Sequence, residues 1–515
     1  MIAKTYSFCL LGLDAYPVEI EIDVASGLPA VNLVGLADTA IKESKERIRA
    51  AIKNSGFFWP GMRITINLTP SDIKKEGAGF DLPIALGVLA ASGQINGELL
   101  KDYFFLGELA LDGKLRPVHG ALSASLALAK QPVKRLVLPE KNAQEAAVVK
   151  EISAWPLPNL SAVIQFLADP SLRQPFKLEI EQIFSQSRDY DLDFADVKGQ
   201  YFAKRALEVA VAGGHNILLI GPPGSGKTML AKRIPTIMPA LSLAEALEIT
   251  KVHSAAGTLL NKGGLIKTRP FRSPHHGISD VALIGGGDIP RPGEISLSHL
   301  GVLFLDELPE FNRKALEALR QPLEDNLICV SRVKRTLFFP AAFILACALN
   351  PCPCGNYFNP QKNCHCSQTK IKNYLGKISG PLLDRIDLHI TVPQVKYTEL
   401  SANQPAEPSA LIRQRVENAR AIQAKRFAQG EKHASSLFYN SRMSHQQIRQ
   451  HCLLDPEAHK LMRMAIEELA LSARAYDKIL KVSRTVSDLA GSEKIQAQHV
   501  AEAIQYRCLD RSFFV

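Results

Sequence analysis

The 515-residue sequence has no apolar run approaching the roughly 18 residues that cross a bilayer as a helix, which excludes a helical membrane protein. We expect no membrane partner. The early apolar stretch YSFCLLGL is short and leads into an alternating strand pattern, so it does not resemble a cleavable export signal. We therefore expect a cytoplasmic protein. Thiols stay reduced in that compartment, so cysteines that cluster in the sequence favour a metal site over a disulfide.

The N-terminal third of the chain has no net charge, because residues 1–180 carry 19 basic and 19 acidic side chains. Residues 181–515 carry 42 basic and 32 acidic side chains, so the whole net charge of +10 lies there. A basic excess confined to one region favours a polyanionic partner, most often nucleic acid. Ordinary variation on a solvated surface is the alternative.

Residues 1–170 alternate short strand and helix patterns. VEIEIDV (18–24) has the period of two that is typical of a half-buried strand, and residues 42–53 have the pattern of a charged amphipathic helix. Asp112-Gly113 lies between two alternating runs and predicts a hairpin. These patterns predict a small α+β domain.

Residues 196–395 change to continuous apolar strands, NILLI, VLFLD, FILACALN and LHITV, which are typical of a parallel sheet covered on both faces. Residues 171–195 are polar and contain prolines, so they predict a linker. Residues 396–515 have helical patterns and predict a helical lid. The predicted fold class is therefore multidomain α/β, with an α+β domain, a parallel-sheet core and a C-terminal helical domain.

The segment GPPGSGKT follows the strand NILLI and precedes a helical pattern, which is the context that a phosphate-binding P-loop requires. Glycines let the backbone N–H groups face the phosphates, Lys227 places a charge on the β- and γ-phosphates, and Thr228 supplies a hydroxyl ligand for Mg²⁺. A chance glycine-rich turn is the alternative, and the complete pattern disfavours it. We expect the whole loop to bind the nucleotide, most simply ATP: Gly221, Pro222, Pro223, Gly224, Ser225, Gly226, Lys227 and Thr228.

Acidic and polar residues follow two further strands. Asp306 ends the strand VLFLD and is a candidate for holding Mg²⁺, and Glu307 beside it is a candidate base for the attacking water. An Asp-Glu pair at a helix start is the alternative when the pair is seen alone. Asn350 ends the next strand, where its amide can orient the water. Together with the P-loop, these residues predict hydrolysis of a nucleoside triphosphate.

Two arginines are candidates for sensing the nucleotide. Arg385 lies between two acidic residues in LLDRID, where it forms either a surface salt bridge or an arginine finger that reaches the γ-phosphate of a neighbouring subunit. Arg474, in the helical C-terminal part, would be a second sensor.

Four of the nine cysteines fall within fifteen positions: Cys352, Cys354, Cys364 and Cys366. Two close pairs of soft ligands suit a structural, tetrahedral Zn²⁺ site, with His365 as a substitute for one thiolate. Free buried thiols are the alternative. Such a short loop has no core of its own, so a metal would hold its shape.

The order of these motifs, with DVKGQ before them and LSARAYDK after them, resembles the ComM/YifB family, magnesium-chelatase-like AAA+ ATPases of the MCM branch. The stretches RPFRSPHHGISDVALIGGG and NPCPCG are similar to sequence motifs of that family, and the resemblance covers nearly the whole chain. It implies a hexameric motor that acts on single-stranded or branched DNA, with recombination proteins as further partners. It also implies branch migration of recombination intermediates during natural transformation.

The resemblance implies an N-terminal domain with the fold of the Lon proteolytic domain (ribosomal protein S5 domain 2-like). KKEGAGFDLPIAL (74–86) lies where Lon enzymes carry their nucleophile, yet no serine occurs between Ser71 and Ser92. Without a hydroxyl there is no covalent chemistry. We expect a scaffold without protease activity.

Two basic segments are candidates for DNA contact. The resemblance implies an insert in helix 2 at about residues 255–300, which contains His275 and His276. A second insert, residues 325–343, reads as a hairpin with Arg332, Lys334 and Arg335 near its turn. Solvated basic loops are the alternative. Cations on such projections would grip phosphates without reading bases.

These observations predict an ATP-driven DNA translocase or helicase. A chelatase-like motor that remodels a protein partner is the alternative, because the nucleotide site would be the same.

Overall fold

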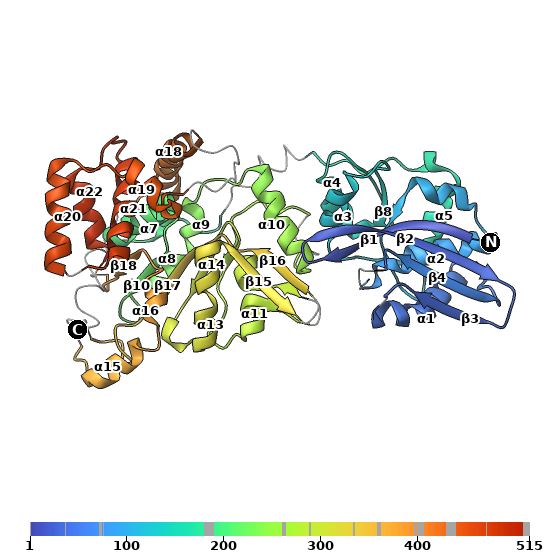
Figure 1. Cartoon of the computed structure of the whole chain (residues 1–515), viewed down its shortest axis with the longest axis horizontal. Coiled ribbons are helices and arrows are strands. Elements are labelled where there is room, and N and C mark those ends of the chain that lie inside the picture. Colours follow the sequence, from blue (N-terminus) through green and yellow to red (C-terminus); the bar gives the residue numbers. More distant parts are fainter. Residues whose placement is uncertain are drawn as a thin grey trace. The chain divides into compact units, whose positions relative to one another are not determined.

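The computed structural model describes most of the chain, namely residues 2–36, 38–71, 75, 77–179, 190–259, 264–287, 290–332, 335–357, 362–395, 399, 406–428, 439–469 and 471–507. It divides into two units, one formed by Met1–Ser187 with Ala246–Lys267 and the other by Arg188–Glu245 with Thr268–Val515 (Figure 1). Within the described ranges, no helix is long and apolar enough to cross a membrane.

The first unit is built on a mixed seven-stranded sheet in the order β3-β4-β2-β1-β5-β8-β9. The β1–β2 and β2–β4 pairs are antiparallel, and the remaining pairs are parallel. The strands are β1 (Ile2–Leu11), β2 (Asp14–Ala25), β3 (Ala30–Val34), β4 (Arg63–Thr69), β5 (Phe104–Phe105), β8 (Arg135–Pro139) and β9 (Ser153–Leu157).

The predicted alternation of residues 18–24 is confirmed, because Val18, Ile20, Ile22 and Val24 of β2 are all buried. The fully buried α2 packs against β1 and β2. The predicted hairpin is confirmed by antiparallel β6 (Glu108–Leu109) and β7 (Leu115–Arg116). The helices are α1 (Thr39–Asn54), α2 (Asp81–Ala91), α3 (Ala121–Leu128), α4 (Ala143–Ala147) and α5 (Leu160–Ala168).

Helix α10 (Leu243–Ala255) crosses the division in the chain, and the residues that follow its first turn pack with the first unit. Lys251 donates to Asp14 at 2.6 Å, and Ser254 donates to the buried carboxylate of Glu145. These contacts give residues 246–267 a place in the first unit, although their sequence position lies inside the predicted ATPase core. The predicted domain boundaries at 170, 195 and 395 stay predictions.

The second unit is built on a parallel five-stranded sheet in the order β11-β14-β17-β10-β18. All residues of β10, β14 and β17 are buried, as continuous apolar strands predict. Because the strands are parallel, their carboxyl ends meet at one edge, where ligands of such sheets bind. The strands are β10 (Ile217–Ile220), β11 (Phe271–Arg272), β14 (Val302–Leu305), β17 (Ile344–Leu349) and β18 (Leu388–Thr391).

Antiparallel strands β15 (Leu327–Arg332) and β16 (Arg335–Pro340) form the hairpin that the second insert predicts. Arg332 and Arg335 are its last paired positions. Their side chains, and Lys334 itself, lie outside what the structure describes.

The C-terminal region is helical in the ranges that the structure describes, as the sequence predicts (Figure 1). Asp387, just before β18 and largely buried, connects helix α21 to the sheet: it pairs with Lys478 at 3.1 Å and with His215 at 3.1 Å. Burial alone would raise the pKa of Asp387, but these two partners lower it below its usual range. The helices are α18 (Ser409–Ala428), α19 (His445–His451), α20 (Pro456–Leu469), α21 (Ala473–Leu489) and α22 (Ala497–Gln505).

The buried ion pair Arg47–Asp81 generates a stability prediction for the first unit. The Asp81 side chain is 1% exposed and accepts from Arg47 Nε at 2.6 Å and from the Leu109 N–H at 3.1 Å. Arg47→Ala leaves a buried carboxyl without its charged partner, and burial already raises the pKa of Asp81. Protonation of the Asp81 carboxyl limits the cost of burying it without a partner. We therefore expect the free energy of unfolding of Arg47→Ala to be about 2 kcal/mol lower than that of the wild type.

Urea unfolding followed by tryptophan fluorescence measures this loss in the first unit, because both tryptophans, Trp59 and Trp155, belong to it. Arg49→Ala is the matched control: its side chain is 48% exposed and lies 4.0 Å from Glu46, so we expect a change below about 0.5 kcal/mol. Equal midpoints for the two variants would contradict the assignment.

Candidate nucleotide site and cysteine cluster

The P-loop connects β10 to helix α8 (Lys227–Lys232) and depends on its glycines. Gly224 and Gly226 have backbone φ values of +75° and +89°, which residues other than glycine rarely adopt. A Cβ atom at Gly221 would collide with the carbonyl oxygen of Val392. The sequence therefore folds into a turn that only glycine can make at these three positions.

The Lys227 ammonium lies at the centre of this turn. Its Nζ donates to the carbonyl oxygens of Gly221 at 2.7 Å and Pro222 at 3.0 Å, and to Asn350 Oδ1 at 3.2 Å. Burial lowers the pKa of Lys227, while the charges of Asp306 and Glu307 act in the opposite direction. The structure thus brings the end of β17 to the P-loop lysine.

Thr228 and Asp306 meet across the same edge of the sheet, with Thr228 Oγ1 donating to Asp306 Oδ2 at 2.7 Å. A hydroxyl and a carboxylate are the hard oxygen ligands that Mg²⁺ prefers. The hydroxyl of Ser225 is buried without a hydrogen-bond partner among the described residues. The donor set therefore fits a triphosphate with its magnesium ion: a buried cation, paired Mg²⁺ ligands and one free hydroxyl.

Glu307 follows Asp306 in a left-handed conformation, with φ 54° and ψ 49°. Its N–H donates to Asp306 Oδ1 at 3.0 Å, and its side chain is 57% exposed. A non-glycine residue in this conformation costs about 1 kcal/mol or more, and such strain is concentrated at functional sites. The turn keeps the carboxylate of Glu307 in solvent beside the candidate Mg²⁺ ligands.

Gln200 contacts the P-loop, and the sequence motifs did not predict this contact. Its Nε2 donates to the carbonyl oxygens of Ser225 at 3.2 Å and Pro393 at 2.6 Å. Gln200 is the last residue of DVKGQ and has φ +57°. Two features of the sequence could have indicated a role for Gln200: the glycine before it and the position of the DVKGQ motif before α7 (Tyr201–Gly213).

Arg385 lies just before β18 and Arg474 at the start of α21, and no hydrogen bond among the described residues joins either side chain to the P-loop of the same chain. Arg385 pairs with Glu324 and donates to the Pro381 carbonyl at 2.6 Å. Arg474, whose side chain is 70% exposed, lies 3.4 Å from Asp384. The sensor roles of both arginines stay predictions.

His276 lies beside Glu307, with 3.6 Å between His276 Nδ1 and Glu307 Oε2. The ring of His275 lies against it in a tilted arrangement, with 4.0 Å between the ring centroids and 35° between the ring planes. Both histidines follow β11, so part of the segment expected as an insert supplies an edge strand of the main sheet. The predicted DNA contact of these histidines stays a prediction.

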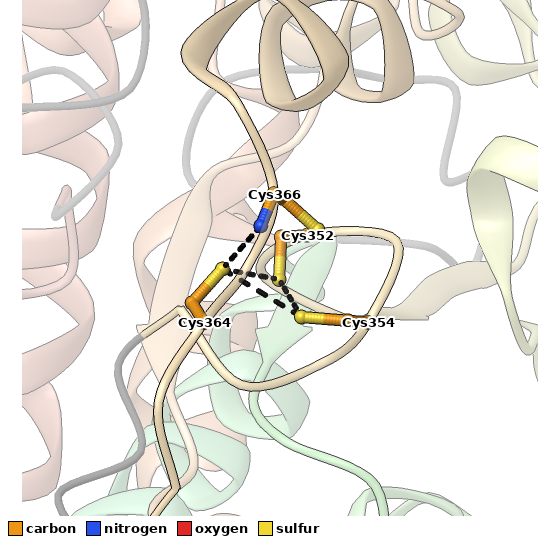
Figure 2. Close-up of side chains that lie close together, drawn as sticks. All are labelled: Cys352, Cys354, Cys364 and Cys366. Atoms are coloured by element: carbon orange, nitrogen blue, oxygen red, sulfur yellow. Dashed lines mark hydrogen bonds between the residues drawn. The ribbon is translucent and has the colours of Figure 1, made fainter.

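The four clustered cysteines converge in space, as Figure 2 shows. Sγ of Cys352 lies 3.3 Å from that of Cys354 and 3.6 Å from that of Cys364, and the Cys354–Cys364 distance is 3.6 Å. With the Sγ atom of Cys366 included, the four sulfur atoms all lie within 4.8 Å of one another. A tetrahedral zinc with Zn–S bonds of about 2.3 Å separates its sulfurs by about 3.8 Å, so the spacing fits this ion.

The protonation of the thiols differs within the cluster. Burial raises the pKa of Cys352 to about 12, whereas the backbone N–H of Asn356 lowers the pKa of Cys354 to about 6. One thiolate is therefore favoured in the free cluster, and thiolates are the form that binds metal.

The cysteine loop packs directly on the P-loop. Gly355 has φ +80°, and a Cβ atom there would collide with the ring of Pro223. The loop starts immediately after Asn350, so its shape and that of the phosphate site depend on each other.

A P-loop after one strand, an Asp-Glu pair after a second, and a polar amide on the strand between them define a P-loop ATPase of the AAA+ class. Family models agree. The model described as magnesium chelatase, subunit ChlI, matches residues 193–400, and models for further parts of the same subunit match residues 20–142 and 406–507.

Relatives match the whole chain. The competence protein ComM of Haemophilus influenzae is 44% identical over 513 residues, 99% of this chain and 98% of its own. The YifB protein of Escherichia coli is 43% identical over 506 residues, 97% of this chain and 96% of its own. Lon protease 2 of Bacillus subtilis is 21% identical over 184 residues, 32% of each chain. The chain therefore belongs to the ComM/YifB family of magnesium-chelatase-like AAA+ ATPases, as the motifs indicated, and the predicted fold class is confirmed.

The cysteine geometry generates a metal prediction. We expect the purified protein to carry about one zinc ion per chain, and Cys352→Ser or Cys364→Ser to remove most of it, because three remaining thiolates hold zinc far less tightly. Elemental analysis by mass spectrometry measures the ratio.

Cys329→Ser is the matched control, because Cys329 lies on β15, outside the cluster, and its loss should leave the zinc content unchanged. Wild-type protein without zinc, or with all four thiols reacting freely under native conditions, would refute the zinc site.

Proposed function

We propose that the protein is an ATP-dependent DNA translocase, a helicase that assembles as a hexameric ring. Its role would be to promote branch migration of recombination intermediates during natural transformation. The observation that carries the proposal is the joint position of Lys227 with Asn350 and of Thr228 with Asp306, in a chain 44% identical to a competence protein. The basic excess of residues 181–515 favours a polyanionic track.

Each residue at the sheet edge has a role in hydrolysis under this proposal. Lys227 holds the β- and γ-phosphates, and Thr228 with Asp306 holds Mg²⁺, which offsets phosphate charge when it is bound. Glu307 accepts the proton of the attacking water, and Asn350 orients that water. In the described structure the amide of Asn350 contacts Lys227, so bound phosphate would compete for the same ammonium.

The two arginines support assembly of several subunits. A finger that completes a neighbour's site does not bind its own phosphate loop, and Arg385 contacts Pro381 and Glu324 instead. Arg474 would be a second sensor of the nucleotide. Arg385 is paired with Glu324 in the same chain and would exchange that carboxylate for a phosphate of the adjacent subunit. The homohexamer is the assembly that this arrangement and the family favour.

DNA contact is assigned to the hairpin of β15 and β16, with Arg332, Lys334 and Arg335 at its end, and to the segment that carries His275 and His276. Basic groups on an antiparallel hairpin can bind phosphates of any sequence, as a moving motor requires. Recombination proteins would be its partners. A motor that remodels a protein partner is the second candidate, because the chain matches models of a magnesium chelatase subunit.

Rate measurements with different nucleic acids separate the two candidates. We expect ATP hydrolysis to rise at least about fivefold with single-stranded or branched DNA. We expect Glu307→Gln to lower kcat about 100-fold or more with ATP binding retained, because only the proton acceptor is lost. A DNA-independent rate in wild-type protein would refute the translocase and favour the protein-remodelling motor.

The hairpin assignment has its own test. Lys334→Ala/Arg335→Ala should weaken DNA binding about tenfold at low salt and reduce the slope of log affinity against log salt by about 2, because two phosphate contacts are lost. Basal ATP hydrolysis should be unchanged. Fluorescence anisotropy with labelled DNA across a salt series measures both quantities.

Lys130→Ala/Lys141→Ala removes the same charge from two exposed positions of the first unit and serves as the control. If the two double variants bind DNA alike, the hairpin does not contact the backbone.

A further inference from the structure

The seven-stranded sheet of the first unit has two edges that differ in how far they are covered. At one edge, β9 contains Pro156, and the Phe176 N–H donates to the carbonyl oxygen of Ala154 at 2.8 Å, so another segment of the chain occupies part of its outer side. At the other edge, β3 pairs with β4 alone (Figure 1). Among the residues that the structure describes, no backbone hydrogen bond reaches the outer side of β3.

β3 also lacks the residues with which natural edge strands discourage further pairing. Its sequence, AVNLV, contains neither a charged residue nor a proline. Val34 within the strand and Leu28 and Leu36 on either side of it are exposed. The outward N–H and C=O groups of such an edge can bind the backbone of another extended chain. The edge of β3 is therefore suited to the addition of a strand.

A cavity lies between this edge and helix α1. It is lined mostly by apolar side chains, among them Val31 and Leu33 of β3, Ile48 of α1 and Ile66 of β4. Its volume of about 340 Å³ falls within the roughly 300–1,000 Å³ of ligand pockets in proteins. Because side chains alternate along a strand, every second residue of an added strand would face this side of the sheet. The cavity favours apolar side chains at those positions.

Two cations lie beside the edge, one on each face of the sheet. Lys45 of α1 lines the cavity, and Arg63 lies opposite Ala30 in the β3–β4 register and next to the inward-facing Ile64. Both side chains are exposed, and neither forms an ion pair with another residue that the structure describes. A second copy of the same edge would bring like charges together, whereas carboxylates on an incoming strand would be attracted.

We propose that the edge of β3 is a docking site for an extended segment of a partner protein in which apolar residues alternate with acidic residues. The apolar side chains would fill the cavity, and the acidic side chains between and beside them would pair with Arg63 and Lys45. Backbone hydrogen bonds to β3 would supply a part of the affinity that does not depend on sequence. The inference is independent of the nucleotide site and gives the first unit a role in recruiting a partner.

Peptide binding followed by fluorescence tests the site in the full-length protein. Trp59 lines the cavity, and in the variant Trp155→Phe it is the single tryptophan of the chain, so its emission reports what enters. We expect the peptide acetyl-Glu-Val-Glu-Leu-Glu-Val-Glu-amide to change this emission saturably. The same peptide with lysine in place of glutamate should bind at least about tenfold more weakly, because its charges face Lys45 and Arg63.

Two methylated forms of the glutamate peptide test strand addition itself. Alternate N–H groups of a strand face the same neighbour, so N-methylation of either the odd-numbered or the even-numbered amides removes the hydrogen bonds to β3. One of the two forms should lose at least about tenfold in affinity. Equal affinities of both forms and the parent peptide would show that the peptide does not add to the sheet, and the proposal would fail.

Lys45→Glu reverses an exposed charge at the cavity and should weaken binding of the glutamate peptide about tenfold. Lys53→Glu is the matched control, because Lys53 is exposed on the same helix and does not line the cavity, so we expect a change below about twofold. Unchanged emission up to about 1 mM peptide, or equal binding by the two variants, would overturn the docking site. If Lys45→Glu changes the sedimentation coefficient of the peptide-free protein, the edge joins copies of this chain and a partner segment is excluded.

Discussion

The parallel register of β10, β17 and β14 is the constraint on which the nucleotide site depends. Neighbouring strands in register end together, and each therefore delivers its next residues to one edge: the P-loop after β10, Asn350 after β17, Asp306 and Glu307 after β14. The 2.7 Å Thr228–Asp306 contact and the 3.2 Å Lys227–Asn350 contact follow from that register. A slip of one residue would turn these side chains to the other face of the sheet.

Much of this architecture could be predicted from the sequence, because the strands that build the site are continuous apolar runs and the P-loop has a fixed spacing. β11 could not be predicted, since two residues are too few to show a period. The role of Gln200 was missed for a different reason: one amide has no pattern, and its two carbonyl partners lie far away in the sequence. His276 was assigned to an insert because its proximity to Glu307 exists only after β11 and β14 have paired.

Polar contacts around β18 in the second unit join more than two side chains. Asp387 joins His215, near β10, to Lys478 of α21, and Asp384 in the same short segment pairs with Arg474. The segment before β18 is therefore connected both to the base of the sheet and to the helical region. A movement of α21 relative to β18 has to break the largely buried Asp387–Lys478 pair, which makes large separations costly and small rotations the easier change.

The close approach of Gly355 to Pro223 also limits which sequences this fold can accept. A methyl group at position 355 would occupy the volume of the proline ring and would require a left-handed backbone that side chains avoid. Substitution in one loop is therefore tolerated only with a compensating change in the other. The cysteine loop and the phosphate loop should consequently be inherited as a unit, and exchange of either one alone between homologues would introduce a steric conflict between Gly355 and Pro223.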